Sequence, residues 1–530
     1  MKPRLLHPEQ DLPFELELDA IGQALVEDLG LELVFGAMAG GDRRIHEVAR
    51  AVVLAGSAAP AVVRYRQAVF DDCLADPATP RRLYELAGEA IERERRVYGG
   101  LWSQHPETIL RRSVEVIGQF VDVLRRLRQL AEERRSAVAS DGLRTLFELL
   151  CRELDEPYLA TIEDHLRRLR FDDGIIVTAE LGAGNRGANY VLRRRVGRPS
   201  WRERLGLADG STYVYEIPDR DEGGFRALAE LTGRGVALAA AAVAASADHV
   251  LDFFRLLRDE VAFYIGALNL HARLIELEVP VCRAEPAPRG SLALRAEGLS
   301  DAALALRLGG PVVGNDLAAD GAELLVVTGA NQGGKSTFLR SLGLAQLLME
   351  AGLPVPARSY RAAVTGRVFT HFSREEDETL RRGKLDEELA RMRAIVDRVR
   401  PGDLVLLNES FSSTNEREGS AIARGVVEAL VEGGVRVAYV THLADLAEGL
   451  AAAGRSGTCF LRAERRPDGT RTYRIVPGAP EGSSHGIDVY RRVFGVEGDE
   501  LALGAPGVPE ARAEGWQDAL AASGQGEPAG

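Results

Sequence analysis

The chain has 530 residues, 45% of them hydrophobic, and this length predicts two to four domains with packed cores. Its formal net charge of −13 excludes a protein that is basic throughout and coats nucleic acid, but it is compatible with a local basic patch. The N-terminal residues are polar and acidic, and no apolar run approaches about 20 residues, so we expect no signal peptide, no membrane span and a cytoplasmic location. Four scattered cysteines without a CxxC pair fit reduced thiols.

Helices are expected first along the chain. Residues 20–170 carry apolar side chains at helical spacing, most clearly over 114–135. From residue 172, β-branched and aromatic runs separated by glycines predict a small β-rich insertion. Helix is expected again to about residue 277, and Pro and Gly over 280–290 mark a domain boundary. Beyond it, short apolar runs alternate with helical segments, which is typical of an α/β domain with a parallel sheet. A hairpin is expected around 467–469.

Lysine is rare in this chain. Of 66 basic residues only Lys2, Lys335 and Lys384 are lysines. A GC-rich coding bias explains the surplus of arginine, so a retained lysine indicates a position where a compact ammonium is needed in place of a planar guanidinium. Lys335 and Lys384 are therefore candidates for function, whereas Lys2 stands beside the initiator.

A glycine-rich loop, TGANQGGKST, occupies residues 328–337 with the spacing G-x-x-x-x-G-K-S. Glycines let successive N–H groups point at phosphate oxygens, and a helix that starts there adds its positive dipole end. We expect Lys335 to reach the β- and γ-phosphates and the Ser336 hydroxyl to ligate Mg²⁺. The alternative is a plain glycine-rich turn, but the loop follows a predicted strand and opens a predicted helix. The expected nucleotide-binding residues are Gly329, Ala330, Asn331, Gln332, Gly333, Gly334, Lys335, Ser336 and Thr337, with Thr337 flanking the metal.

Two further strand ends carry candidate catalytic residues. The run LVLLNES, residues 404–410, places Glu409 where a carboxylate would polarise the attacking water; the alternative is an ordinary strand-end Glu. Asn408 stands where such strands usually carry an Asp that holds Mg²⁺ indirectly. Asn keeps the oxygen acceptor and loses the charge, so we expect a slow ATPase with a raised Mg²⁺ requirement. His442 follows the run VAYVT and is a candidate for sensing the γ-phosphate or orienting water; the alternative is a structural histidine.

These segments together resemble the ATPase domain of the MutS mismatch-repair family. The family's phosphate loop typically reads TGPNMGGKST. VVGNDLAADGAELLVVTG, VFTHFSREEDETLRRGKLDEELARM and SSHGIDVYRRVFG are similar to its flanking segments. The resemblance runs in order over about 290–495 and extends more weakly to the helices upstream.

The resemblance implies a fold class: a multidomain protein with an α-helical core and lever region and a small β-rich insertion, followed by an α/β P-loop ATPase domain. The expected bounds are 1–170 for the helical core and lever, 171–222 for the clamp-like insertion, 223–287 for the helical return, 288–503 for the ATPase domain and 504–530 for a flexible tail. It also implies ATP and Mg²⁺ as cofactors and a homodimer with composite ATP sites. The residues expected to reach a neighbouring subunit are Lys384, Glu388, Ser412, Ser413 and Thr414, although Lys384 also fits a solvent-facing position.

DNA is the expected partner. The clamp-like insertion contains an arginine-rich segment with Trp201, and its DNA candidates are Arg193, Arg194, Arg195, Arg198 and Arg202. The alternative is an arginine-biased solvated loop. Recognition by DNA shape is expected over base readout.

The sequence also departs from the family. Only about 20 residues precede the expected core, so we expect a short member without the N-terminal mismatch-reading domain. No nuclease-like C-terminal domain is evident, and Val312 and Val313 stand where an aromatic residue would stack on adenine.

Three hypotheses follow. The first is a MutS-like ATPase clamp acting on DNA in repair or recombination control. The second is a nucleotide-gated interaction scaffold with weak ATPase activity and no direct DNA role. The third is a transporter-type or SMC-type ATPase, which the missing S-G-G-Q signature disfavours.

Overall fold

The computed structural model describes residues 1–56, 59–98, 105–171, 174–185, 187–193, 216–218, 220–330, 332–374, 383–466 and 470–480. All of these lie in the unit Met1–Gly482. The expected tail over 504–530 and the closing motif over 483–495 lie outside the described residues.

The N-terminal part of the chain is helical. Apolar residues at a period near 3.6 give each helix one face to bury, and Asp or Ser side chains cap several of the helix starts. The helices are α1 (Ala20–Leu29), α2 (Leu31–Ala39), α3 (Arg43–Leu54), α4 (Pro60–Ala75), α5 (Ala78–Tyr98), α6 (Pro106–Arg134), α7 (Asp141–Glu153) and α8 (Glu156–Leu169).

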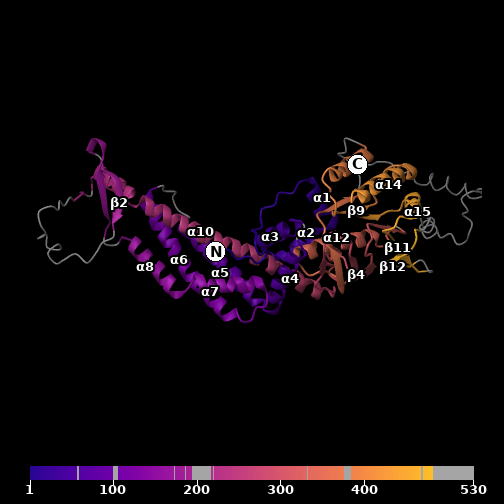
Figure 1. Ribbon diagram of the computed structural model, residues 1–530, viewed down its shortest axis with the longest axis horizontal. Helices are drawn as coiled ribbons and strands as arrows, with labels where there is room; N and C mark the ends of the chain where they lie inside the picture. The colour runs from indigo at the N-terminus through magenta and orange to yellow at the C-terminus, as the bar shows by residue number, and fades with distance from the viewer. Residues whose placement is uncertain are drawn as a thin grey trace, which may run out of the picture. The chain divides into compact units, whose positions relative to one another are not determined.

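The helix α10 (Glu222–Glu276) is a single helix of 55 residues and forms the centre of this part. It packs along α5 and α6, as Figure 1 shows, and also contacts α2 and α3. Among the described helices, α10 alone is long and apolar enough to cross a membrane by length and composition, a test that core helices of soluble proteins also pass. Most of the buried residues of α10 lie in its C-terminal half and include Phe254, Leu257 and Tyr264.

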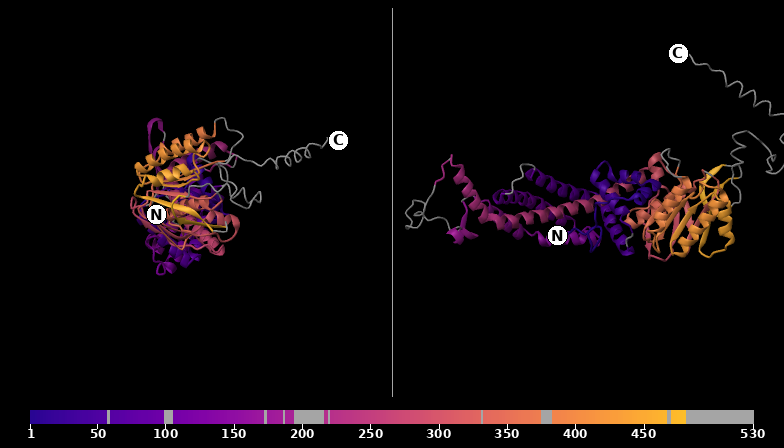
Figure 2. Two further views of the ribbon diagram at one scale, coloured as in Figure 1. Left: turned by 90° about the vertical axis from the view of Figure 1, so that its right-hand side faces the viewer. Right: turned by 90° about the horizontal axis from the view of Figure 1, so that it is seen from above.

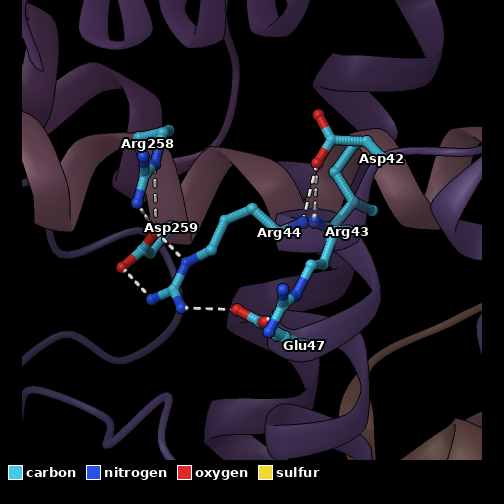
Figure 3. Close-up of polar contacts among 7 residues, drawn as sticks. Asp42, Arg43, Arg44, Glu47, Arg258 and Asp259 are labelled. Carbon is cyan, nitrogen blue, oxygen red and sulfur yellow. Dashed lines mark hydrogen bonds and ion pairs between the residues drawn. The ribbon is translucent and has the colours of Figure 1, made fainter. Parts of the chain in front are cut away.

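A cluster of charged side chains joins α3 to α10 (Figure 3). The Arg44 guanidinium donates to both carboxylate oxygens of Asp259, over 2.8 and 2.6 Å, and to Glu47 over 3.0 Å. Arg258 also donates to Asp259 over 3.2 Å, and Asp42 caps the start of α3. Asp259 is 6% exposed, so this pairing supplies the partners that its buried charge needs.

The first residues of the chain pack into the helical core without forming a regular element. Leu5 and Leu6 are each 1% exposed. The Leu5 N–H donates to the Glu260 carboxylate over 2.5 Å, and the Tyr264 hydroxyl donates to the Leu5 carbonyl over 2.7 Å. Burial raises the pKa of Glu260 to about 7.

A β-hairpin precedes α10. It consists of β1 (Ile176–Leu181) and β2 (Gly187–Arg193), which pair antiparallel around a short turn, η1 (Ala183–Asn185). The hairpin lies within the segment for which the sequence predicts a β-rich insertion, and residues 194–215 of that segment lie outside the described part of the chain.

Two sheets follow residue 280 (Figures 1 and 2). The six-stranded sheet has the order β12-β11-β6-β10-β9-β8 and is parallel except for β12. Its strands are β6 (Leu324–Thr328), β8 (Val368–Phe372), β9 (Leu404–Asn408), β10 (Arg436–Val440), β11 (Thr458–Arg465) and β12 (Arg471–Pro477). The four-stranded sheet has the order β3-β7-β4-β5 and consists of β3 (Glu285–Ala287), β7 (Ser359–Ala363), β4 (Leu294–Leu299) and β5 (Asn315–Ala318).

The central strands β6, β9 and β10 of the larger sheet are buried on both faces, which explains why they are mainly apolar runs. Side chains alternate between the two faces: Leu325 and Val327 of β6 join the main core, whereas Leu324 and Val326 join a second core. Helix α12 (Lys335–Ala351) packs in the main core. Helices α13 (Lys384–Val396), α14 (Glu416–Glu432) and α15 (Ala444–Ala452) contribute to the second core. A short helix, α11 (Ala302–Leu308), precedes β5.

Two buried arginines tie these layers together. Arg436 on β10 donates to the carbonyls of Ala293 and Ala319, beside β4 and β5, and so joins the two sheets. Arg66 on α4 donates to the Leu6 carbonyl over 2.8 Å and to the Glu350 carbonyl near the end of α12 over 3.4 Å. The helix that starts at the glycine-rich loop therefore ends against the helical part of the chain.

Candidate functional site

The glycine-rich loop connects β6 to α12, as the sequence predicts. Gly329 and Gly334 have φ of 114° and 93°, a region that side chains other than glycine rarely adopt. A Cβ on Gly334 would lie 3.2 Å from the Tyr473 carbonyl, so both backbone conformation and close packing require glycine there. Gly334 is also the N-cap residue of α12, and it has no side chain that could accept from the first N–H groups of the helix.

Lys335, the first residue of α12, is 4% exposed. Its ammonium donates to the carbonyls of Gly329 over 2.7 Å and Ala330 over 3.2 Å, and lies 4.0 Å from a Glu409 carboxylate oxygen. Burial lowers the pKa of Lys335, and the charge of Glu409 opposes that shift. The fold thus holds a cation inside the loop, where it can meet anionic oxygens.

Ser336 and Asn408 lie in direct contact although 72 residues separate them. The Ser336 hydroxyl donates to the Asn408 amide oxygen over 2.9 Å. Because the hydroxyl and the amide oxygen are both hard oxygen ligands, this pair is suited to Mg²⁺ or its water shell. Asn408, which stands where ATPase strands of this kind usually carry an acid, therefore lies beside Ser336.

Glu409 and His442 follow the neighbouring strands β9 and β10. The strands are in register, with Val440 opposite both Asn408 and Val327, so their carboxyl ends meet beside the glycine-rich loop. The His442 Nδ1 lies 3.8 Å from a Glu409 carboxylate oxygen. Glu409 has a left-handed φ of 53°, which holds its side chain in a strained turn at the end of β9.

A pocket of about 420 Å³ adjoins the loop. Apolar residues line it together with loop residues and one aromatic residue, Tyr473; the lining residues are Leu304, Leu308, Pro311, Val312, Val313, Asn315, Gln332, Gly333, Gly334, Lys335, Ser336, Thr337, Glu409 and Tyr473. Its size and its wall of apolar side chains fit an organic ligand whose anionic end lies at the loop.

Tyr473 is a site residue that the sequence reasoning missed. It lies on β12, is half exposed, and has a left-handed φ of 58°. The hairpin of β11 and β12 packs directly on the loop: Arg471 donates to the Gln332 side chain over 2.6 Å, and Ala463 lies beside Gly329 and Gly333. The strand pattern of this segment predicts a hairpin, but it carries no signal that the hairpin meets the loop.

Of the residues expected to reach a second subunit, Glu388 is buried, whereas Lys384, Ser412, Ser413 and Thr414 are partly exposed. Glu388 is 2% exposed, and one of its carboxylate oxygens accepts from the Ser413 hydroxyl over 3.0 Å. The Thr414 hydroxyl donates to Glu418 over 2.6 Å. Lys384 is the first residue of α13 and is partly exposed, as is Ser412.

One DNA candidate is described. Arg193 ends β2 and donates to the Thr178 hydroxyl over 3.1 Å on the exposed hairpin. The other candidates, Arg194, Arg195, Arg198 and Arg202, lie outside the described residues, as does Asn331 of the loop.

Comparisons with known proteins match both parts of the chain. A family model described as the MutS2 N-terminal domain matches residues 58–277, and one described as MutS domain V matches residues 325–496. A region of 228 residues, 40% of this chain, is 30% identical to the DNA mismatch repair protein MutS of Chloroflexus aurantiacus and covers 24% of that protein.

Two proteins named endonuclease MutS2 are also similar. The protein of Thermus thermophilus is 32% identical over 173 residues, which cover 32% of this chain and 23% of the relative. The protein of Anaeromyxobacter sp. is 34% identical over 202 residues, which cover 36% and 23%. The chain therefore spans about a quarter of the length of these curated relatives. Two family models in the expected order, together with relatives that share the ATPase region, show that the chain belongs to the MutS family.

Proposed function

We propose that this chain is an ATP-hydrolysing, DNA-binding protein of the MutS family that acts as a clamp-like dimer in DNA repair or recombination control. The observation that carries the proposal is the meeting of Lys335, the Ser336–Asn408 pair, Glu409 and His442 at the carboxyl ends of adjacent parallel strands. In open α/β sheets ligands bind at this edge.

The described residues fit ATP and Mg²⁺. In the proposed site the loop over Gly329–Thr337 cradles the phosphates, and its buried ammonium, Lys335, is already oriented by two carbonyls that a phosphate would replace. The N–H groups at the start of α12, where Gly334 provides no side-chain cap, are suited to phosphate oxygens. Ser336 and Asn408 would hold Mg²⁺, directly or through water; the bound ion would neutralise charge on the phosphates.

Hydrolysis requires a group that orients and deprotonates water. Glu409 supplies the carboxylate, and His442 lies close enough to share the same water or contact the γ-phosphate. Because Asn408 carries no charge where an acid would strengthen metal binding, the proposed reaction is slow and needs more Mg²⁺ than in relatives with the acid.

The DNA and dimer functions rest on the family and on two segments. Arg193 is part of an exposed hairpin whose continuation is rich in arginine, which suits phosphate contact without base readout. Lys384 and the Ser412–Thr414 turn would reach the ATP of a second subunit and complete a composite site.

One observation favours a second function. With Asn408 in place of an acid, a nucleotide-gated scaffold that binds ATP, hydrolyses it poorly and engages a protein partner is also consistent with the site. The two functions differ in whether DNA changes the ATPase rate.

The test is ATP turnover by the full chain with and without DNA. Duplex, single-stranded, mismatched and branched DNA are compared at several salt concentrations, with Glu409→Gln as the control that retains ATP binding. We expect at least one DNA form to change kcat and to bind with an affinity that falls as salt rises. Turnover that ignores every DNA form, together with absence of salt-dependent binding, would favour the scaffold. Equal turnover by Glu409→Gln would refute the site.

A further inference from the structure

The turn that carries Glu409 is strained and buried. Glu409 and Phe411 both have left-handed φ angles, 53° and 64°, and Ser410 between them is completely buried. Residues with a Cβ adopt this region at a cost, and they stay there only when the surroundings hold them. The position of the Glu409 carboxylate therefore depends on what holds Ser410.

Side chains on both neighbouring strands hold Ser410. On β8, the Nδ1 of His371 lies 2.7 Å from the Ser410 hydroxyl oxygen. The same hydroxyl is placed to donate to the His371 carbonyl, which is 2.8 Å away. On β10, the Tyr439 hydroxyl donates to the Ser410 carbonyl over 2.6 Å. His371 and Tyr439 both pair with Leu407 of β9 from opposite sides, so the turn after β9 is held from two directions.

The hydrogen-bond partners of His371 define its tautomer. Its Nε2 lies 3.0 Å from the Glu388 carbonyl, which can only accept, so Nε2 carries the proton. Burial lowers the pKa of His371 to about 4, so the ring is neutral and Nδ1 is an acceptor. The single proton of the Ser410 hydroxyl is then donated either to Nδ1 or to the His371 carbonyl. In both arrangements the partner of Ser410 is His371.

The same histidine connects this turn to α13. Its ring stacks on Phe411 with a centroid separation of 5.6 Å, and Nε2 holds the backbone of Glu388 on α13. The Glu388 side chain in turn accepts from Ser413 in the turn that follows Phe411. His371 therefore connects β8 and α13 to the two residues that follow Glu409, Ser410 and Phe411.

We propose that His371 and Ser410 are positioning residues that hold the strained turn and so fix the Glu409 carboxylate in the orientation required for attack by water. The proposal rests on the proposed ATPase function. Neither residue is expected to touch ATP, because both are fully buried and neither lines the pocket beside the loop. Their effect on the reaction passes through Glu409.

The test uses the full chain and the variant Ser410→Ala, which removes the hydroxyl that His371 binds. Ser341→Ala is the matched control: Ser341 is equally buried, and its hydroxyl donates to the Phe338 carbonyl within its own helix. We expect Ser410→Ala to lower kcat by about 10- to 100-fold, since small misplacements of a catalytic group cost about that much. The Kd for ATP should stay within about twofold of wild type, and Ser341→Ala should retain kcat.

A cycle with Glu409→Gln separates positioning from general destabilisation. If Ser410 acts through Glu409, Ser410→Ala lowers kcat much less when Glu409→Gln is already present. An undiminished effect in that background, a parallel loss of ATP binding, or a kcat equal to that of Ser341→Ala would overturn the proposal. If Ser410→Ala does not fold, Tyr439→Phe, which removes one hydrogen bond to the same turn, is judged by the same criteria. A wild-type chain without turnover would overturn the proposed ATPase and this proposal together, whereas normal turnover with an unaffected Ser410→Ala overturns only this one.

Discussion

Replacing Asn408 by aspartate should lower the Mg²⁺ concentration that the ATPase requires. In the structure the Ser336 hydroxyl donates to the Asn408 amide oxygen over 2.9 Å, so an aspartate at this position would place a charged oxygen on the same partner. A carboxylate would add a full negative charge beside the divalent cation, and this charge strengthens the attraction between the site and the metal. A gain of about 1.4 kcal/mol in metal binding corresponds to a tenfold lower half-saturating Mg²⁺ concentration.

The assay is steady-state ATP turnover across a Mg²⁺ titration for wild type, Asn408→Asp and Asn408→Ala. Asn408→Ala removes the oxygen and should raise the requirement above that of wild type. Without Mg²⁺, Asn408→Asp should bind ATP more weakly than wild type because the new carboxylate repels the phosphates. An unchanged half-saturating Mg²⁺ concentration in Asn408→Asp, or loss of turnover at every Mg²⁺ concentration, would refute the assignment of Asn408 to the metal.

Three further predictions concern parts of the fold around the site. Glu260 has a pKa of about 7 in the folded chain, because the carboxyl group is buried, and a pKa near 4.5 in the unfolded chain. As the pH rises from about 4.5 to 7, the unfolded chain loses this proton first. The free energy of unfolding should therefore fall by about 3 kcal/mol over that pH range. Glu260→Gln should lack that loss, so urea unfolding at about pH 5 and pH 8 should show a gap between variant and wild type only at the higher pH. Tyr473 is the aromatic residue of the pocket wall, so Tyr473→Ala should weaken ATP binding about tenfold through loss of contact with the organic part of the ligand, and should leave the binding of inorganic tripolyphosphate unaffected. Tyr473→Phe should bind both ligands like wild type. Calorimetry that shows equal losses for both ligands would contradict this. Arg44→Met should lower the free energy of unfolding by about 2 kcal/mol, because Asp259 loses its bidentate partner and keeps only Arg258. The double variant Arg44→Met/Asp259→Leu should recover part of this loss, which thermal melts would measure.

The sequence predicts well those elements that local rules determine. The strand β6 is an apolar run of five buried residues, and α12 begins at Lys335 and ends before Gly352, which has a left-handed φ of 81°. The hairpin of β11 and β12 is confirmed as well. Each of these elements has its own apolar pattern and a Gly or Pro at its boundary, so no distant contact is needed to infer it.

Contacts between distant segments could not be predicted in the same way. Tyr473 reaches the pocket only because β12 is added antiparallel to β11 at the sheet edge, a topology that its own residues do not encode. The bond between Ser410 and His371 depends on β8 pairing beside β9. The resemblance names Glu388 as a residue that would reach a neighbouring subunit, and it gives no sign that the packing of α13 buries this side chain against Ser413. These contacts depend on how separate elements pack together, whereas the periodicity of a sequence predicts only the type of a single element.

The helix α12 connects the glycine-rich loop to the helical part of the chain. It is 17 residues long, or about 25 Å, and a hydrogen-bonded helix of that length moves as a stiff rod. One end holds Lys335, and the other end is bonded through the Glu350 carbonyl to Arg66, which also holds Leu6. Through these bonds the helix that carries Lys335 is connected to α4 and to the N-terminal segment. If binding at the loop shifts α12 against α4, linkage requires that a ligand bound at α4 change the affinity of the loop by the same free energy.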